Sequence, residues 1–449
     1  MFSKILVANR GEIALRIMRA ARELGVKTVA VYSLEDKDTY PVRYADEAVC
    51  IGPAPSSQSY LVIPSIIAAA KNTGAEAIHP GYGFLAENAD FARACADNDL
   101  VFIGPNPDCI ERMGDKNTAR ETMKRCGVPT VPGSDGIVET LEDAHDFANR
   151  VGYPILIKAT AGGGGKGMRE VHTPEKLESE FLAAQAEAQA AFGNKDVYLE
   201  KLVYRPRHVE VQVLADDFGS RVALCERDCS IQRRHQKLLE EAPSPALSEE
   251  LRRAMGVAAI KAVRAVDYKN AGTIEFLLDQ DNNFYFMEMN TRIQVEHPVT
   301  EEITGVDIVK EQIRIAAGEP MTCAERAPFV PYGHSLEFRI NAEDPACGFR
   351  PCPGTITRFE MPAGPGIRIE SYVGEGSRIS PYYDSLVAKL IVWGQDRTEA
   401  LERAKRALSE FVIEGIKTTI PFHKEVLENE IFVQGLACTD FIDATRGDK

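Results

Sequence analysis

A run of five glycines among lysines is the segment of this sequence best suited to phosphate chemistry. Gly162 to Gly165 and Gly167 follow an apolar stretch, Lys158 precedes them and Lys166 interrupts them. Glycine lets backbone N–H groups curl around a phosphate, and lysine supplies charge to its oxygens. The spacing differs from the P-loop pattern G-x-x-x-x-G-K-[ST]. The run is therefore interpreted either as a flexible hairpin tip or as a mobile lid over nucleotide phosphates.

A pair of glutamates lies in two strand-like stretches, residues 273–278 and 284–289, that are separated by turn-forming residues. A hairpin centred between residues 281 and 282 places Glu275 opposite Glu288, with about 5 Å between their Cβ atoms. Asn290 shares that face. Opposed carboxylates repel unless a cation or proton bridges them, and hard oxygen ligands suit Mg²⁺ or Mn²⁺. The alternatives are lysine or arginine partners, or a different register.

The next segment places three polar residues at alternating positions, Arg292, Gln294 and Glu296. These side chains point the same way if the backbone remains extended. Arg292 could then clamp a small oxyanion, and Glu296 could act as a base toward it. A solvated polar edge is the alternative, but the intervening Ile293 and Val295 indicate packing beneath.

A basic run from Arg233 to Lys237 follows another strand-like stretch. Charge runs most often form a solvated face. In an enzyme that handles ATP and a small anion, the same run could instead supply positive charge near the phosphates.

The elements that must position these residues begin with an alternation of strand and helix patterns. Residues 4–8 and 27–32 are typical of buried strands, and apolar residues recur at helical spacing between positions 13 and 24. The alternation returns between residues 75 and 104, which predicts an open parallel α/β sheet. Because Asn9 to Glu12 replaces the G-x-G-x-x-G fingerprint after the first strand, a dinucleotide site is disfavoured.

Strand patterns dominate beyond residue 113, with helical stretches at residues 175–191 and 248–265, so this region is predicted to be α+β. A Pro-rich stretch at residues 325–333 is a plausible linker. Further strand patterns and a helix at residues 398–411 follow it.

Composition narrows the class of protein. The chain has 449 residues, 44% of them hydrophobic and 27% charged, which predicts a globular protein of two or three domains. A net charge of −15 argues against nucleic-acid binding. No apolar run approaches the roughly 20 residues that span a membrane. The N-terminus opens directly on a strand pattern, so we expect a cytoplasmic location, with the ten cysteines reduced.

These segments together resemble biotin carboxylase, a branch of the ATP-grasp superfamily, over essentially the whole chain. The matching segments are Ile5–Ile13, His79–Leu85 with Glu87 and Asn88, the glycine run, Glu226–Ser230, Arg233–Lys237, Glu288–Pro298 and Arg339–Asp344. The resemblance implies a Rossmann-like domain at residues 1–113, an ATP-grasp domain at 114–325 and a mixed β-rich domain at 334–445. Residues 131–203 or thereabouts would carry the glycine-rich lid.

The resemblance also implies roles for individual residues. The residues implied to bind ATP are Lys116, Lys158, Gly163, Gly164, Gly165, Lys166, Met168, Glu200, Lys201, Val203, His208, Gln232, His235 and Leu277. The residues implied for the metal, expected as two Mg²⁺ or Mn²⁺ ions with ATP, are Glu275, Glu288 and Asn290. The residues implied to bind bicarbonate are Lys237, Arg292, Gln294 and the Val295 backbone. Glu296 would remove the bicarbonate proton, Arg339 would stabilise the biotin anion, and Tyr82 would lie near the biotin ring.

The implied reaction is the first half-reaction of acetyl-CoA carboxylase in fatty acid synthesis. Bicarbonate would attack the γ-phosphate of ATP to give carboxyphosphate and ADP. Carboxyphosphate would then break down to CO₂ and phosphate, the phosphate would take the N1 proton of biotin on a carrier protein, and the biotin anion would take up the CO₂. The sequence contains no Ala-Met-Lys-Met biotinylation motif and has no room for a carboxyltransferase domain. We therefore expect the biotin carboxyl carrier protein and the carboxyltransferase subunits to be separate chains. The family resemblance also implies a homodimer.

Two other functions compete with this interpretation. Another ATP-grasp ligase, forming carbamoyl phosphate or joining amino acids, would share the glycine run and the metal pair but would not need Arg339 or the segment beginning at His79. A nucleotide-binding regulatory protein without turnover predicts the loss of Glu296, Arg292 or a metal carboxylate, and all of these are present.

Overall fold

The structure is a computed structural model that describes residues 1–134, 136–159, 168–192 and 194–447. The chain divides into two compact units. Unit 1 contains Met1–Val128, Arg207–Phe276 and Glu288–Lys449, and unit 2 contains Pro129–Pro206 and Leu277–Met287. Among the described residues, no helix has the length and apolar character required to cross a membrane.

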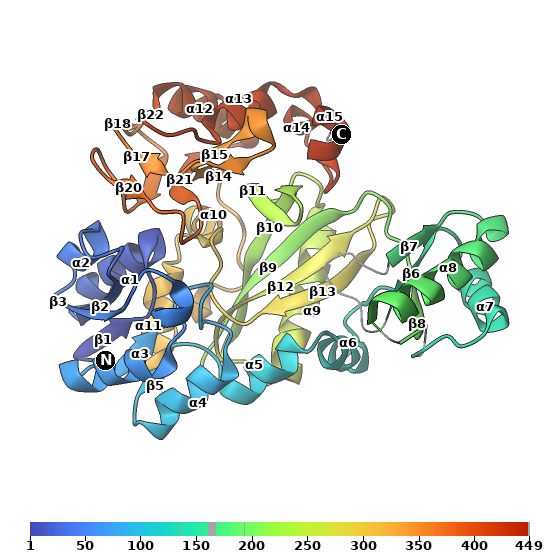
Figure 1. Ribbon diagram of the computed structural model, residues 1–449, viewed down its shortest axis with the longest axis horizontal. Helices are drawn as coiled ribbons and strands as arrows, with labels where there is room; N and C mark the ends of the chain where they lie inside the picture. The colour runs from blue at the N-terminus through green and yellow to red at the C-terminus, as the bar shows by residue number, and fades with distance from the viewer. Residues whose placement is uncertain (135, 160–167, 193, 448–449) are drawn as a thin grey trace. The chain divides into compact units, whose positions relative to one another are not determined.

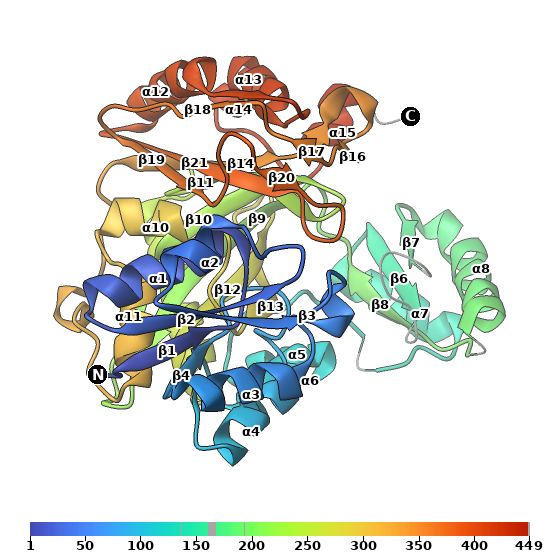
Figure 2. The same cartoon turned by 60° about the vertical axis from the view of Figure 1, so that its left-hand side comes forward.

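Unit 1 begins with a five-stranded parallel sheet, drawn in blue in Figures 1 and 2. Its strand order is β3-β2-β1-β4-β5, with bounds β1 (Lys4–Val7), β2 (Lys27–Ser33), β3 (Glu47–Gly52), β4 (Ala77–His79) and β5 (Val101–Phe102). The helices of this region are α1 (Gly11–Glu23), α2 (Tyr40–Tyr44), η1 (Ser56–Gln58), α3 (Ile63–Thr73), α4 (Ala89–Asp97), α5 (Pro107–Gly114) and α6 (Lys116–Arg125). Apolar side chains of β1 and α1 pack together, including Ile5, Val7 and Ile13. The predicted parallel α/β layout is confirmed.

A second sheet of eight strands follows, with the order β13-β12-β9-β10-β11-β14-β21-β19. Its strands are β9 (Arg207–Ala215), β10 (Arg221–Arg233), β11 (Gln236–Ala242), β12 (Asn270–Leu278), β13 (Phe284–Asn290), β14 (His334–Asn341), β19 (Ile367–Ser371) and β21 (Leu386–Gly394). The helices between them are α9 (Glu249–Ala265), α10 (His297–Thr304), α11 (Ile308–Ala316) and η2 (Ala324–Arg326). Because β14 pairs with β11, the sheet continues past the Pro-rich stretch into the C-terminal part of the chain.

The C-terminal part adds three two-stranded sheets and a helical layer. The small sheets pair β15 (Glu343–Asp344) with β16 (Arg350–Pro351), β17 (Gly354–Thr355) with β20 (Arg378–Ile379), and β18 (Arg358–Glu360) with β22 (Val412–Glu414). The helices are η3 (Pro345–Cys347), α12 (Arg397–Glu410), α13 (Ile420–Glu428), α14 (Glu430–Val433) and α15 (Phe441–Arg446).

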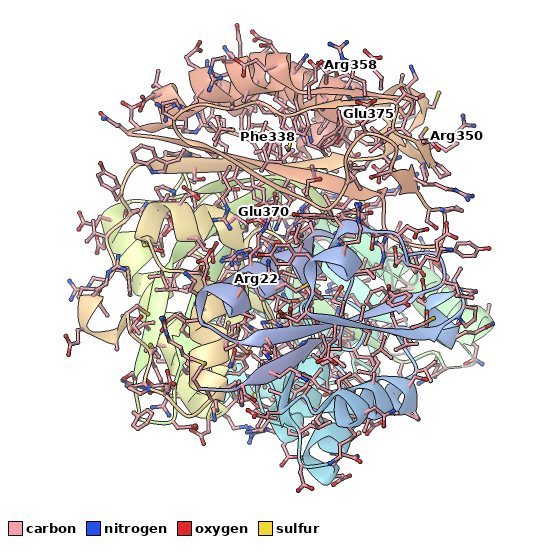
Figure 3. All side chains as sticks on the ribbon, turned by 90° about the vertical axis from the view of Figure 1, so that its left-hand side faces the viewer. Arg22, Phe338, Arg350, Arg358, Glu370 and Glu375 are labelled. Carbon is pink, nitrogen blue, oxygen red and sulfur yellow. The ribbon has the colours of Figure 1, made fainter. Side chains whose placement is uncertain are left out.

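Alternation along β14 separates an apolar face from a charged face. Leu336, Phe338 and Ile340 belong to the core beneath α12 and α13, and Figure 3 labels Phe338 in this layer. Since successive strand residues point to opposite faces, Glu337 and Arg339 lie on the other side of the sheet. Both therefore face away from the apolar core of the C-terminal helices.

Unit 2 contains a three-stranded sheet of order β7-β6-β8. Its elements are α7 (Leu141–Val151), β6 (Ile155–Ala159), β7 (Met168–Val171), α8 (Pro174–Phe192) and β8 (Val197–Lys201). Phe147 of α7 and Phe181 of α8 pack with Ile155 and Leu199 to form its core. The amphipathic helices thus cover the sheet and give this unit a hydrophobic centre of its own.

Candidate active site

Lys237 of β11 lies at the centre of a buried cluster of carboxylates in unit 1. Its Nζ atom lies 2.6 Å from Glu210, 3.0 Å from Glu275 and 2.6 Å from Glu296. Burial favours the neutral amine, but these three carboxylates outweigh burial and raise the pKa of Lys237 well above its usual value. The lysine is therefore a permanent positive charge at the centre of the cluster.

Glu296 joins this lysine to Arg339 of β14. Its carboxylate accepts hydrogen bonds from Lys237 at 2.6 Å and from Arg339 Nη2 at 2.9 Å. Burial favours the protonated acid, but the two cations overcome that effect and hold the pKa of Glu296 well below its ordinary value. Glu296 is consequently ionised at neutral pH and can accept a proton.

A cavity of about 480 Å³ in unit 1 adjoins this pair. Its lining includes four of the residues that the sequence suggests for bicarbonate and biotin, namely Tyr82, Arg292, Val295 and Arg339. The other lining residues are Asn9, Arg10, Gly11, Glu12, Ile13, Ser56, Gly83, Phe84, Gln236, Asn341, Tyr372, Tyr382, Tyr383, Asp384 and Leu386. A cavity with three arginines on its wall suits a small anion beside a polar ring.

The segment after β13 does not continue as a strand. β13 ends at Asn290, and an irregular loop leads into α10 at His297, so the assumption of an extended backbone is wrong. The loop nevertheless directs Gln294 to Glu275 at 2.7 Å and brings Glu296 to Lys237 at 2.6 Å. Tertiary hydrogen bonds, not strand alternation, therefore bring these side chains together.

Arg292 and Val295 are held by residues from other parts of unit 1. Arg292 donates to Glu87 at 2.8 Å and to the side-chain oxygen of Asn290 at 2.9 Å. The Val295 carbonyl accepts a hydrogen bond from the buried Lys389 at 2.9 Å. Tyr82 donates its hydroxyl proton to Glu12. Each of these contacts fixes a group on the cavity wall.

The glutamate pair has two different environments. Glu275 accepts hydrogen bonds from Lys237 at 3.0 Å, Asn290 at 2.8 Å and Gln294 at 2.7 Å. Glu288 is half-buried, and Lys116 and Lys237 act on it through their charges. Burial and the charge of Glu275 raise the pKa of Glu288. A bound divalent cation would offset the cost of burying the Glu288 charge and the repulsion between the two carboxylates. The carboxylate oxygens of Glu275 and Glu288 are therefore suitable ligands for Mg²⁺ or Mn²⁺.

The turn of this hairpin differs from the expected one. Asp279 N–H donates to the Asn283 carbonyl at 2.9 Å, and Asn282 adopts a positive φ of 64°. The turn is thus centred on Asp281, one register step from the assumed centre. A uniform register continued from this turn would place Met287, not Glu288, opposite Glu275. The two glutamates still lie close enough for Glu275 to raise the pKa of Glu288.

Replacing Glu288 with glutamine should separate metal binding from folding. Since the folded-state pKa of Glu288 is raised, its ionised form destabilises the metal-free protein at pH values above that pKa. The variant is expected to melt at a slightly higher temperature than wild type without metal, and to lose most of the additional stabilisation by Mg-ATP. Thermal unfolding with and without Mn²⁺ or Mg-ATP checks this, with the exposed Asp281→Asn as a control. If Mn²⁺ and Mg-ATP stabilised Glu288→Gln as much as they stabilise the wild type, Glu288 would be excluded as a metal ligand.

The residues suggested for ATP belong to both units. In unit 2, Lys158 pairs with Glu200 at 2.5 Å, and Lys201 donates to the Gly152 and Tyr153 carbonyls at 3.1 and 3.0 Å. Met168 begins β7, Val203 follows β8, and Leu277 lies in β12. Gly163, Gly164, Gly165 and Lys166 lie outside the described residues.

The remaining ATP candidates belong to unit 1. His208 of β9 pairs with Glu275 at 2.8 Å, so it lies beside the suggested metal ligands. Gln232 of β10 is opposite Lys237 of β11. His235 lies in the two-residue turn between these strands with a positive φ of 65°. Lys116, at the start of α6, is exposed, and its charge acts to lower the pKa of Glu288.

Four further residues of this cluster were not identified from the sequence. Arg227, Glu210, Glu240 and Lys389 are each fully buried beside the candidate residues. Arg227 lies within a segment that resembles the family, Glu226–Ser230, and Glu240 follows Lys237 by three positions. Charged residues inside apolar strand patterns are the signal that could have found them, because such residues are buried only when paired.

Comparison with known proteins identifies relatives over nearly the whole chain. Models of the biotin carboxylase N-terminal and C-terminal domains match residues 1–110 and 337–444, and a model of the carbamoyl-phosphate synthase L chain ATP-binding domain matches residues 115–324. A biotin carboxylase of Nostoc sp. is 60% identical over 441 residues, which cover 98% of each chain. One of the pyruvate carboxylase subunits of Methanothermobacter thermautotrophicus is 55% identical over 446 residues, 99% of this chain and 90% of the relative.

A solved structure is similarly close. It is the biotin carboxylase domain dimer of Hydrogenobacter thermophilus 2-oxoglutarate carboxylase, in complex with MgADP, ADP and bicarbonate. Its sequence is 51% identical, the TM-score is 0.88, and the match covers 99% of this chain and 98% of the other. The similarity in sequence and in fold therefore extends across both units.

Proposed function

Because the chain belongs to the biotin carboxylase family of ATP-grasp ligases, we propose that it uses ATP and bicarbonate to carboxylate biotin on a separate carrier protein. The observation that carries this proposal is the contact of Glu296 with both Lys237 and Arg339 beside the cavity. An ionised acid between two cations can take a proton from an anion that the same cations attract.

In the proposed reaction, Arg292, Lys237 and Gln294 hold bicarbonate together with the Val295 backbone. Glu296 accepts the bicarbonate proton, and the resulting dianion attacks the γ-phosphate of ATP to give carboxyphosphate and ADP. Lys389 fixes the Val295 peptide through its carbonyl, immediately before Glu296 in the sequence. The buried hydrogen bonds of the cluster thus keep the base and the anion-binding groups in place before the substrate arrives.

Glu275 and Glu288, with Asn290, would hold the divalent cation, which when bound neutralises negative charge on the phosphates. Arg339 would stabilise the enolate-like anion of biotin, whose ring would lie near Tyr82. Both residues line the cavity, which supports their assignment to the same substrate.

For the nucleotide, we propose that Lys116, Lys158, His208, Gln232 and His235 contact its polar groups. Glu200 and Val203 would present backbone groups to adenine, with Leu277 packed against the ring. The further members of this proposed set are Gly163, Gly164, Gly165, Lys166, Met168 and Lys201. We also propose a biotin carboxylase N-terminal domain at residues 1–113, an ATP-grasp domain at 114–325 and a C-terminal domain at 334–445.

The full complex would contain a biotin carboxyl carrier protein, carboxyltransferase subunits and two copies of this chain. Acetyl-CoA is the proposed acceptor of the carboxyl group, for fatty acid synthesis. A second candidate is pyruvate, because a relative of 55% identity is named as part of a pyruvate carboxylase. Reconstitution with the carboxyltransferase from the same source, followed by detection of malonyl-CoA or oxaloacetate, separates the two.

ADP release by the purified protein tests the proposed reaction directly. With Mg-ATP, we expect release to require bicarbonate and to rise severalfold on addition of free biotin. Turnover that ignores biotin and responds to ammonia or an amino acid would instead assign the chain to another kind of ATP-grasp ligase.

A further inference from the structure

Two buried glutamates on neighbouring strands face each other next to Arg339. Glu240 of β11 is directly opposite Glu337 of β14 in the antiparallel register. Both have an exposed fraction of 0%. Directly opposed residues of an antiparallel pair have their Cβ atoms about 5 Å apart and share one face of the sheet. The two carboxyl groups are therefore neighbours in a region without solvent.

The hydrogen bonds of the two glutamates differ. Neither oxygen of Glu337 receives a hydrogen bond from the described residues, and the same holds for Oε2 of Glu240. The other oxygen, Oε1 of Glu240, accepts from Arg339 Nε at 2.7 Å and lies 2.5 Å from Arg339 Nη2. Glu240 thus has a cation to balance its charge, whereas no hydrogen-bond donor among the described residues reaches Glu337.

The charged and titratable groups around this pair come from several elements of unit 1. They are Arg339 on β14, Lys237 on β11, Cys229 on β10, Lys389 on β21, and Glu296, which precedes α10. Lys389 of β21 pairs through its ammonium group with Glu12 at 3.2 Å and donates a hydrogen bond to the Val295 carbonyl at 2.9 Å. Its ammonium group is therefore directed to other partners.

Two opposed carboxylates in such a setting cannot both carry a full charge. An ionised carboxylate that is buried without a hydrogen bond is strongly disfavoured, and protonation removes the cost. Burial, together with the charges of Glu240 and Glu296, raises the pKa of Glu337 well above its ordinary value despite Lys389 and Arg339. Burial also raises the pKa of Glu240, to about 7, even though Arg339 opposes the shift.

We propose that Glu337 is a neutral carboxylic acid in the working protein and that it shares its proton with Glu240, so that the pair presents one negative charge to Arg339. Glu240 is then a positioning residue, which holds the Arg339 guanidinium between itself and Glu296. The effect on the reaction rests on the role proposed for Arg339, but the shared proton does not. The two parts can therefore be tested separately.

Infrared spectroscopy tests the proton without any assay of activity. Wild-type protein labelled with ¹³C in its glutamate carboxyl groups should show the C=O stretch of a buried carboxylic acid at a pH well above the Glu240 pKa of about 7, and this band should be missing from Glu337→Gln. If that variant does not fold, Glu337→Asp serves instead, because an unlabelled aspartate also removes the labelled carboxyl group from position 337. The absence of such a glutamic acid band from the wild type at that pH, or its persistence in the variant, would overturn the proposal.

Activity then tests the consequence for Arg339, once the wild type has been shown to respond to biotin. Glutamine is a neutral isostere of the acid, so Glu337→Gln should retain the wild-type melting temperature. Its kcat should remain within about threefold of the wild-type value. Glu240→Gln leaves Arg339 with one carboxylate, and we expect the KM for biotin to rise about tenfold with a smaller change in kcat.

The pH profile distinguishes positioning from a merely structural role. Wild-type activity should fall as the pH drops through the Glu240 pKa of about 7, because protonation removes the charge that holds Arg339. If Glu337 is already a neutral donor to Glu240, its replacement by an amide removes no negative charge and supplies a weaker donor, so Glu337→Gln should leave this acid limb in place or move it to slightly higher pH. A clear shift of the limb to lower pH in Glu337→Gln would show that Glu337 carries a negative charge in the wild type, and it would overturn the proposal. A loss of activity and stability equal to that of Glu240→Gln would also overturn it.

Discussion

Replacing Glu296 with glutamine is expected to reduce biotin-dependent ADP release by about 10²- to 10⁴-fold, the usual contribution of a general base. The carboxylate is 2% exposed and lies 2.6 Å from Lys237 and 2.9 Å from Arg339. These cations keep it ionised, so it is ready to accept the bicarbonate proton at neutral pH. Glutamine preserves the shape of the side chain but cannot accept that proton, so the loss should fall on kcat.

The matched control is Glu302→Gln in α10, whose carboxylate pairs with Arg368 at 3.2 Å. This partly exposed pair should contribute at most about 1 kcal/mol to stability. The control is expected to retain wild-type turnover. Near-wild-type kcat in Glu296→Gln, with ATP and bicarbonate saturating, would exclude Glu296 as the base. Because the pKa of Glu296 is far below neutral, its titration should not produce the acid limb of the wild-type pH profile.

The parallel sheet could be predicted from the sequence because its elements are local patterns. Short apolar runs alternate with helical periodicity from β1 to β5, and Asn88 caps α4 by accepting a hydrogen bond from Phe91 N–H at 2.8 Å. Such signals need only a few consecutive residues. The full length of β10 could not be predicted, for the opposite reason. Its second half, through Arg233, carries charged residues that only tertiary partners make compatible with a buried strand.

The geometry of the candidate site could be predicted only in part from local sequence patterns. The predicted hairpin placed Glu275 close to Glu288, but its turn was centred one register step from the turn in the structure. The difference arises because Asn282 adopts a positive φ, which adds a residue to the loop. Strand alternation also grouped Arg292, Gln294 and Glu296, although the loop that carries them is irregular. Their approach depends on contacts such as that between Gln294 and Arg227, 67 positions apart at 2.7 Å. No pattern within one segment encodes contacts of that range.

Replacing Arg227 with methionine should destabilise the protein by about 3–5 kcal/mol, the usual cost of breaking a buried ion pair. The guanidinium is 0% exposed and donates to Glu210 at 2.5 Å, Gln212 at 2.8 Å and Gln294 at 2.7 Å. It also reaches the hydroxyl groups of Thr273 and Thr300 at 3.2 and 3.0 Å. Methionine fills a similar volume but removes the five hydrogen bonds that the guanidinium donates to these buried groups.

The same variant should impair the proposed bicarbonate site in protein that still folds. Gln294 uses its side-chain oxygen toward Arg227 and its nitrogen toward Glu275, so Arg227 determines which way the amide points. Without that hydrogen bond the amide can rotate, and the KM for bicarbonate should rise more than kcat falls. Arg227→Lys, which keeps the charge but has fewer donors in a different geometry, should lie between wild type and methionine.

Urea unfolding of each variant measures the first effect, and the KM for bicarbonate measures the second. Arg221→Met on the same strand is the control, because Arg221 pairs with Asp267, whose side chain is 92% exposed. Exposed pairs of this kind contribute about 0–1 kcal/mol. If Arg227→Met unfolded at the same urea concentration as Arg221→Met, the buried network would not contribute to stability. If its KM for bicarbonate were also unchanged, Arg227 would have no part in orienting Gln294.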